Sequence, residues 1–119
     1  MLAIDGSPFR TAAMRWLHAV VAVVAAAAIP NAALAATHTI IQVDRSFKPA
    51  EISIAVGDTL AFSNQDEFIH QIYVDSDRIA YDSAEQPPGE IITIPFPKSG
   101  NFPIRCHIHP KMLLVVHVK

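Results

Sequence analysis

The residues of this sequence that are best suited to chemistry lie close together near its carboxyl end. Residues 106–112 read Cys-His-Ile-His-Pro-Lys-Met, so a thiol, an imidazole and a thioether recur at intervals of three residues. The thiol belongs to Cys106, the single cysteine of the chain, and Pro110 restricts the backbone between the donors. Thiolate and thioether sulfur favour Cu(I), and imidazole binds copper in either oxidation state. The spacing therefore predicts one side of a metal site.

One more imidazole from a distant strand would complete this donor set, and His70 is the candidate. Two His nitrogens and one Cys sulfur in a plane, with a long axial Met, form an electron-transfer copper site. The residues therefore predict a metal site made by His70, Cys106, His109 and Met112. Zinc held by one Cys and two His is an alternative that these residues leave open. The spacing of the methionine speaks against it.

Short strands must position these side chains. Residues 69–74 alternate between apolar and polar types, which places His70 on one face of a strand. Residues 75–89 are polar, contain two prolines and predict a long loop, while Pro103 removes a ladder donor and predicts a sheet edge at that point. Strands are predicted over residues 37–43, 51–56, 59–63, 69–74, 90–96, 101–106 and 112–118. This pattern predicts an all-β sandwich in a single small domain.

The amino-terminal part of the chain has a different composition. Two arginines precede a run of small and apolar residues from 17 to 29, and a proline ends the run. Ala33-Leu34-Ala35 then supplies small residues at the −3 and −1 positions of a cleavage site. A basic start, a short apolar stretch and an A-x-A end predict a secretory signal peptide over residues 1–35. The apolar run is too short to span about 30 Å of hydrocarbon comfortably.

Export predicts a periplasmic domain over residues 36–119 with no membrane span, and we expect it to be a monomer. Translation of the chain starts at Met1 or at Met14, and a start at Met14 gives a more compact signal sequence. A lone thiol in an oxidising compartment is a liability unless it is buried or ligated. A domain this small also gains stability from a bound metal, since no disulfide can form within it.

Composition excludes several classes of function. The formal net charge of −2 gives no electrostatic reason to expect nucleic-acid binding. A single cysteine excludes a disulfide framework, a four-cysteine zinc site and a C-x-x-C redox pair. The acidic residues are scattered, and the sequence has neither a serine nucleophile motif nor a phosphate loop. We therefore do not expect an enzyme.

Two sets of motifs resemble the cupredoxin family. The pattern Gly100-x-Phe102-x-Ile104-x-Cys106-x-x-His109-x-x-Met112 resembles the carboxyl-terminal copper motif of these proteins. Upstream, Phe47-Lys48-Pro49, Gly57-Asp58-Thr59, Phe62-Ser63-Asn64-Gln65-Asp66 and His70 resemble the plastocyanin and amicyanin pattern that leads to the first His ligand. The two-residue gaps between Cys, His and Met are similar to the short loop of amicyanin. The resemblance covers nearly all of residues 37–119.

The resemblance implies a Greek-key sandwich with one type 1 copper ion under one end, and an intense visible absorption. It implies that His70, Cys106 and His109 are equatorial ligands and that Met112 is axial. The residue after the first His is Gln71, where the family usually has Asn, Thr or Ser, and this neighbour commonly ties the two ligand loops together.

The function implied is that of a periplasmic blue copper protein that shuttles single electrons, with electrons leaving through the outer edge of His109. The redox partners would be a dehydrogenase or oxidase and a c-type cytochrome, and the amicyanin-like loop hints at an amine dehydrogenase. A periplasmic module for copper delivery or storage is the alternative. The further histidines at 38, 107 and 117 favour it mildly, although His107 and His117 are predicted to lie on the surface.

Overall fold

The computed structural model of the chain describes residues 6, 19–27 and 34–119. The chain divides into two units, Met1–Asn31 and Ala32–Lys119. In the first, residues 19–27 form neither helix nor strand. Residues 1–5, 7–18 and 28–33 of the predicted signal peptide, including Ala33 of the cleavage site, lie outside the described residues. Within the described ranges, no helix has the length and apolar character needed to cross a membrane.

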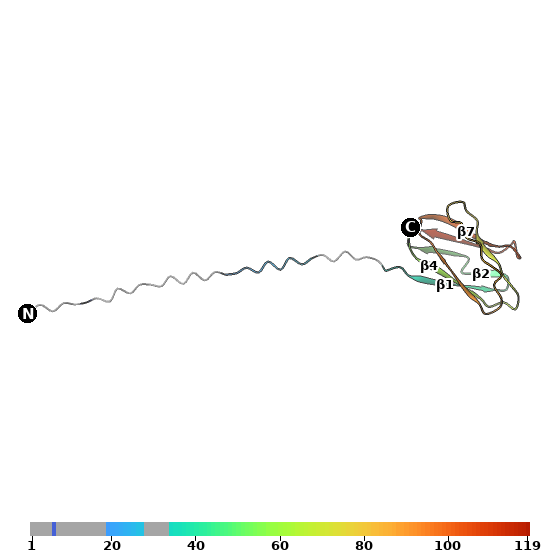
Figure 1. Cartoon of the computed structure of the whole chain (residues 1–119), viewed down its shortest axis with the longest axis horizontal. Helices are drawn as coiled ribbons and strands as arrows, with labels where there is room; N and C mark the ends of the chain where they lie inside the picture. The colour runs from blue at the N-terminus through green and yellow to red at the C-terminus, as the bar shows by residue number, and fades with distance from the viewer. Residues whose placement is uncertain (1–5, 7–18, 28–33) are drawn as a thin grey trace, which may run out of the picture. The chain divides into compact units, whose positions relative to one another are not determined.

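In the second unit the described residues form eight strands in two layers (Figure 1). These are β1 (Thr37–Val43), β2 (Ser46–Lys48), β3 (Glu51–Ile54), β4 (Thr59–Asn64), β5 (Ile72–Val74), β6 (Ile91–Pro95), β7 (Gly100–Cys106) and β8 (Leu113–Val118). One sheet has the order β2-β1-β4-β6 and the other the order β3-β8-β7-β5. Pairs β1–β4 and β3–β8 are parallel, and the remaining pairs are antiparallel. The predicted all-β sandwich is confirmed.

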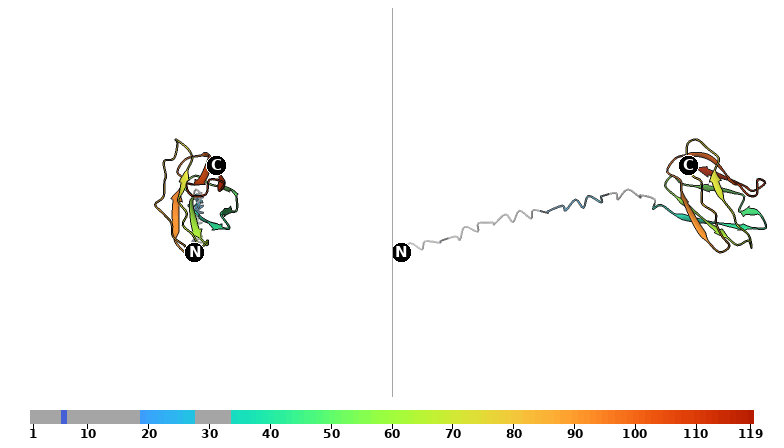
Figure 2. Two further views of the ribbon diagram at one scale, coloured as in Figure 1. Left: turned by 90° about the vertical axis from the view of Figure 1, so that its right-hand side faces the viewer. Right: turned by 45° about the vertical axis from the view of Figure 1, so that its right-hand side comes forward.

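The core lies between the two sheets because alternate residues of each strand point inward. Along β4, Leu60 and Phe62 are buried while their neighbours are partly exposed. Phe62 meets Phe47 of β2 edge-to-face, with ring centroids 5.9 Å apart. The turn between β7 and β8 lies at the opposite end of the sandwich from the start of β1 and the carboxyl terminus (Figures 1 and 2).

Two predictions about strands need correction. The strand expected over 69–74 begins only at Ile72, and His70 forms an isolated bridge to Gln86 instead. The predicted loop 75–89 is therefore partly paired. Gln86 forms a bridge to His70, before β5, and Asp82 forms a bridge to Tyr73, within β5. The short strand β2 was not predicted, because its three residues are too few to show alternation.

Pro103 does not mark an edge of its sheet as a whole, since β7 lies between β8 and β5. β5 pairs only with Ile104 to Cys106, so it ends beside Pro103. The carbonyl of Pro103 accepts a hydrogen bond from the amide of Asp75, just beyond β5, at 2.8 Å. The missing N–H therefore falls where regular pairing with β5 has already stopped, which makes the proline tolerable in an inner strand.

Strand β6 offers a matched test of the sandwich. Ile94 is fully buried, whereas Ile91 on the same strand is 61% exposed. We predict that Ile94→Ala lowers the free energy of unfolding by about 2–5 kcal/mol and that Ile91→Ala changes it by less than about 0.5 kcal/mol. Denaturant unfolding of both variants measures this difference. Equal losses would contradict the assignment of the inner and outer faces.

Candidate metal centre

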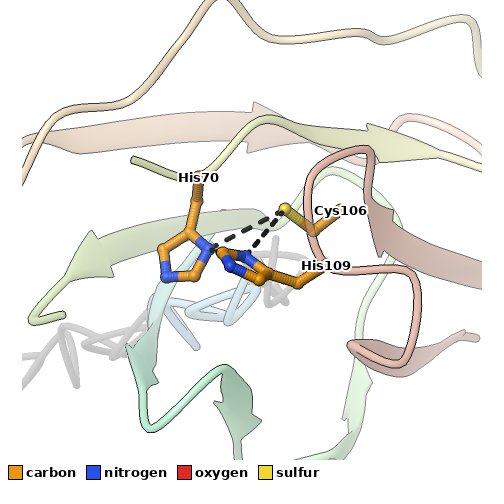
Figure 3. A group of neighbouring side chains, drawn as sticks. All are labelled: His70, Cys106 and His109. Atoms are coloured by element: carbon orange, nitrogen blue, oxygen red, sulfur yellow. Dashed lines mark hydrogen bonds between the residues drawn. The ribbon is translucent and has the colours of Figure 1, made fainter. Parts of the chain in front are cut away.

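Three predicted donors meet at one end of the sandwich (Figure 3). Cys106 is the last residue of β7, His109 lies in the turn before β8, and His70 comes two residues before β5. Cys106 Sγ lies 3.8 Å from His70 Nδ1 and 3.9 Å from His109 Nδ1. The two Nδ1 atoms lie 3.3 Å apart. All three donor atoms thus form one small triangle.

The triangle has the size that a trigonal ion requires. Metal–nitrogen bonds of about 2.0–2.1 Å and a metal–sulfur bond of about 2.3 Å, arranged in a plane, place the nitrogens about 3.5 Å apart and each nitrogen about 3.8 Å from sulfur. The three observed separations lie within a few tenths of an ångström of these values. The donor set therefore fits a metal ion without rearrangement of the backbone.

Asp66 fixes the orientation of the buried His70. Its Oδ2 lies 2.7 Å from His70 Nε2. A carboxylate only accepts hydrogen bonds, so Nε2 carries the proton and Nδ1 presents its lone pair to the other two donors. Carboxylates commonly hold metal-binding histidines in this way.

The same carboxylate ties the ligand to the turn between β1 and β2. Asp66 accepts hydrogen bonds from the amides of Asp44, at 2.6 Å, and Arg45, at 3.2 Å. Burial opposes ionisation of Asp66. The hydrogen bonds from His70 and from these two amides outweigh burial and hold the pKa of Asp66 below its usual value. Because Asp66 stays negative, it can anchor both His70 and the turn.

Backbone hydrogen bonds join the two segments that carry the ligands. The amide of Gln71 points at Cys106 Sγ from 3.4 Å, and the carbonyl of Gln71 accepts a hydrogen bond from the amide of His107 at 2.8 Å. The family's usual side chain at this position is absent, and the Gln71 amide group instead donates to the carbonyl of Ser83 at 3.2 Å. The link between the loops therefore runs through the main chain and does not depend on the side chain at residue 71.

Two buried amides that were not predicted as site residues hold the segment before His70. Asn64 Nδ2 donates to the carbonyls of Phe68 and Gln86 at 2.9 Å, and its Oδ1 accepts from the amide of Asp66 at 3.0 Å. Gln86 Nε2 donates to the carbonyl of Phe62 at 2.9 Å. A polar residue at an inward position of an alternating strand, as at Asn64, was the signal available in the sequence.

Met112 lies at the far end of the same turn and is 1% exposed. Its amide donates to the carbonyl of His109 at 3.0 Å, which closes the turn between the two residues. Met112 is thus buried and belongs to the same chain segment as Cys106 and His109. Its role as an axial ligand remains a prediction.

His109 is the outer member of the triangle. It is partly exposed, and its ring lies 5.2 Å from that of Phe68, over which the Arg45 guanidinium sits at 4.6 Å. Burial lowers the pKa of His109, and the neighbouring His70 and Arg45 lower it further. Neutral imidazole is the form that binds metal, so these neighbours prepare His109 for ligation.

The three further histidines lie away from the triangle. His107 stacks on Tyr73, with ring centroids 4.0 Å apart, and contacts Asp82 at 3.1 Å. His117 contacts Glu51 and Asn101 across the strand surface, and both histidines are partly solvent-exposed, as predicted. His38 contacts Asp58.

The metal-free protein allows a test of this electrostatic arrangement. We predict that His109 titrates below pH 6.5, because burial and the nearby His70 and Arg45 disfavour its protonated form. Its contribution to folding stability is therefore full above the unfolded pKa of 6.5 and is lost as the pH falls through 6.5 toward the folded pKa. NMR titration of the ring protons measures the pKa, and Arg45→Gln should raise it. A pKa of His109 at or above 6.5 would contradict the prediction.

No protein-family model matches the sequence, and no curated protein matches it significantly. Solved structures do match. A domain of the copper-containing nitrite reductase from Thermus scotoductus SA-01 is 30% identical over 68% of this chain, with a TM-score of 0.63. The chain spans only 22% of that enzyme, about a fifth of its length.

Two smaller proteins are matched over most of their length. The purple cupredoxin from Nitrosopumilus maritimus is 22% identical, covers 68% of this chain and 98% of its own, and has a TM-score of 0.62. A variant of amicyanin in its Cu(I) form is 17% identical, covers 70% of this chain and 82% of its own, and has a TM-score of 0.65. The resemblance found in the sequence is thus confirmed by structure, and the chain is a cupredoxin in fold, with an architecture similar to that of amicyanin.

Proposed function

We propose that this chain is a periplasmic type 1 copper protein that carries single electrons between redox partners. The observation that carries the proposal is the triangle of His70 Nδ1, Cys106 Sγ and His109 Nδ1, with separations of 3.3 to 3.9 Å. Two imidazoles and one thiolate, with the thioether of Met112 in the axial position, suit copper of both oxidation states. The bound ion would supply a reversible one-electron couple.

Hydrogen bonds within the chain hold the proposed ligands in place. Asp66 holds His70, the Gln71 amide points at the thiol of Cys106, and Met112 closes the turn on His109. Ligands fixed in this way change position little when the charge at the centre changes by one. Small movement on a change of charge favours fast electron transfer, so these hydrogen bonds support electron carriage rather than delivery.

Exposed apolar residues lie next to the proposed ligands in the sequence. Ile69 precedes His70, Ile108 precedes His109 and Leu113 follows Met112, and they are 37%, 45% and 39% exposed respectively. We propose that this apolar rim is where a partner docks, with His109 as the route for electrons. Redox encounters bury less surface than stable complexes, typically below about 1,200 Å². A dehydrogenase and a c-type cytochrome are the partners we propose.

The amino-terminal sequence supports export. A basic start, a short apolar run and the Ala33-Leu34-Ala35 ending are typical of a signal peptide cleaved after Ala35. The buried Cys106 fits an oxidising compartment, because burial and ligation protect the thiol there. We therefore propose that the mature protein comprises residues 36–119 and lies in the periplasm.

The proposed thiolate ligand can be tested by its spectrum. We predict that copper-loaded protein absorbs strongly in the visible range and that Cys106→Ser abolishes this band, since the band requires the sulfur. Optical titration with Cu(II) measures it. Ile104→Val, a change to a buried strand residue on the same face, serves as the control and should keep the band.

Two outcomes would overturn the copper assignment. One is a visible band that persists in Cys106→Ser, which would exclude thiolate ligation. The other is a colourless wild-type protein after Cu(II) loading of the folded, reduced chain. Metal analysis of protein purified from its native compartment separates copper from zinc, which the same donors could bind.

Electron carriage can be separated from copper delivery by kinetics. We predict fast self-exchange between the Cu(I) and Cu(II) forms, measured by NMR line broadening. Ile108→Lys should slow it at least about tenfold, because a charge in the rim disfavours close approach of two sites, and the optical spectrum should not change. Val56→Lys, a control at a residue that is 49% exposed and whose amide donates to the carbonyl of Lys119 at the opposite end of the sandwich, should have little effect. Slow exchange combined with transfer of the metal to an acceptor would support delivery.

A further inference from the structure

A carboxylate holds the start of β1 at the end of the sandwich away from the metal centre. Asp58 Oδ1 accepts a hydrogen bond from the amide of Ala36 at 2.9 Å. Its Oδ2 accepts from His38 Nε2 at 2.9 Å and from the amide of Ala55 at 3.0 Å. Asp58 is 5% exposed, so this carboxylate is almost fully enclosed by its partners.

Asp58 is negative and has little positive charge around it. The hydrogen bonds from Ala36, His38 and Ala55 lower the pKa of Asp58 to about 2, so it is ionised at neutral pH. Among the residues that the structure describes, His38 is the one ionisable side chain that forms an ion pair with it. Burying a negative charge with neutral partners is less favourable than pairing it with a cation. The carboxylate could therefore accommodate another positive group.

Asp58 contacts the residue that directly follows the predicted cleavage site, Ala36. Ala36 is the residue before β1, and its carbonyl accepts a hydrogen bond from the amide of Thr59 at 2.9 Å. Leu34 and Ala35, just before it, are exposed, and no hydrogen bond is described for either. A cut after Ala35 would free the backbone nitrogen of Ala36, which donates to Asp58. A cut after Ala36 would remove both contacts, and a cut after Leu34 would leave a neutral amide at Ala36.

We propose that Asp58 is the receptor for the processed amino terminus: cleavage between Ala35 and Ala36 frees an α-ammonium group that forms a salt bridge with Asp58. This inference rests on the proposed export but involves none of the metal donors. The hydrogen bond that the uncut chain makes through a neutral amide becomes charge-assisted after processing. Processing therefore strengthens the attachment of β1, the strand that joins β2 to β4.

The salt bridge has a definite dependence on pH. The ionisable groups that contact the new terminus are Asp58 directly and His38 through the shared carboxylate. The negative Asp58 should raise the pKa of the α-ammonium above its ordinary value of about 8. A raised pKa contributes stability that is full below the unfolded pKa and is lost as the pH rises through the folded pKa.

The test starts from the full-length gene, expressed with export, and the processed protein is purified. Intact mass should place the first residue at Ala36. The α-amine, labelled by reductive methylation and titrated by NMR, should have a pKa clearly above 8. It should return to about 8 in Asp58→Asn, whereas His38→Gln, which keeps the carboxylate, should leave it raised.

A second measurement does not depend on how well Asp58→Asn folds. Ala35→Phe places a large residue at the −1 position and should prevent cleavage. The uncut protein should be less stable than the processed protein at pH 7, and this difference should disappear as the pH rises past the pKa of the α-amine. Asp58→Asn should reduce the difference between cut and uncut forms.

A first residue other than Ala36, an unshifted amine pKa, or a cut-to-uncut difference that does not vary with pH would each overturn the proposal. These failures are distinguishable from failure of the proposed function, because the copper spectrum of the processed protein is recorded separately and arises at the other end of the sandwich. A colourless protein with a raised amine pKa would support the salt bridge and contradict the copper assignment.

Discussion

The central constraint on this fold is that three donor atoms lie within a few tenths of an ångström of the separations that a trigonal ion needs. These atoms come from separate parts of the chain. His70 is 36 residues away from Cys106. Hydrogen bonds between the two ligand segments maintain this arrangement. The main chain at Gln71 contacts both Cys106 Sγ and the amide of His107, so the two segments are joined next to the donors themselves.

The sandwich supplies the rigidity that these hydrogen bonds need. Ile72 of β5 is opposite Cys106 of β7 in the register, which places the approach to β5 beside the end of β7. Since β7 lies between β8 and β5, the sulfur is attached to an inner strand of the sheet. The buried amides of Asn64 and Gln86 extend the same order into the irregular segment that carries His70. The donors therefore sit on fixed elements even though two of them lie outside regular strands.

Buried carboxylates perform a similar task at both ends of the molecule. Asp66 binds a ligand imidazole and the amides of the β1–β2 turn, while Asp58 binds the start of β1, the amide of Ala55 and the imidazole of His38. Both are nearly inaccessible to solvent, and the pKa of each is lowered by the donors around it. A short acidic side chain that accepts several hydrogen bonds can hold several segments of the chain at one point. Both carboxylates act on β1, one at its start and one just beyond its end.

The sequence by itself determined the fold class, most of the strands and the set of candidate donors. Alternation is a local property, so the strands over residues 51–56 and 59–63 could be predicted without knowing what they pack against. The spacing of Cys106, His109 and Met112 is local as well, and it limited the choice of metal. The three-residue strand β2 and the true start of β5 escaped prediction because pairing partners, rather than composition, define them.

Only the tertiary structure decided how the donors are held. No local pattern connects Asp66 to the turn at Asp44, Gln71 to the sulfur of Cys106, or Asp58 to the amide of Ala36, because each pair is separated by more than twenty residues. Hydrogen bonds over such distances depend on the sheet register, which a single sequence does not specify. For the same reason, the link through residue 71 could be expected from the resemblance, but its formation by the main chain could be seen only in the folded protein.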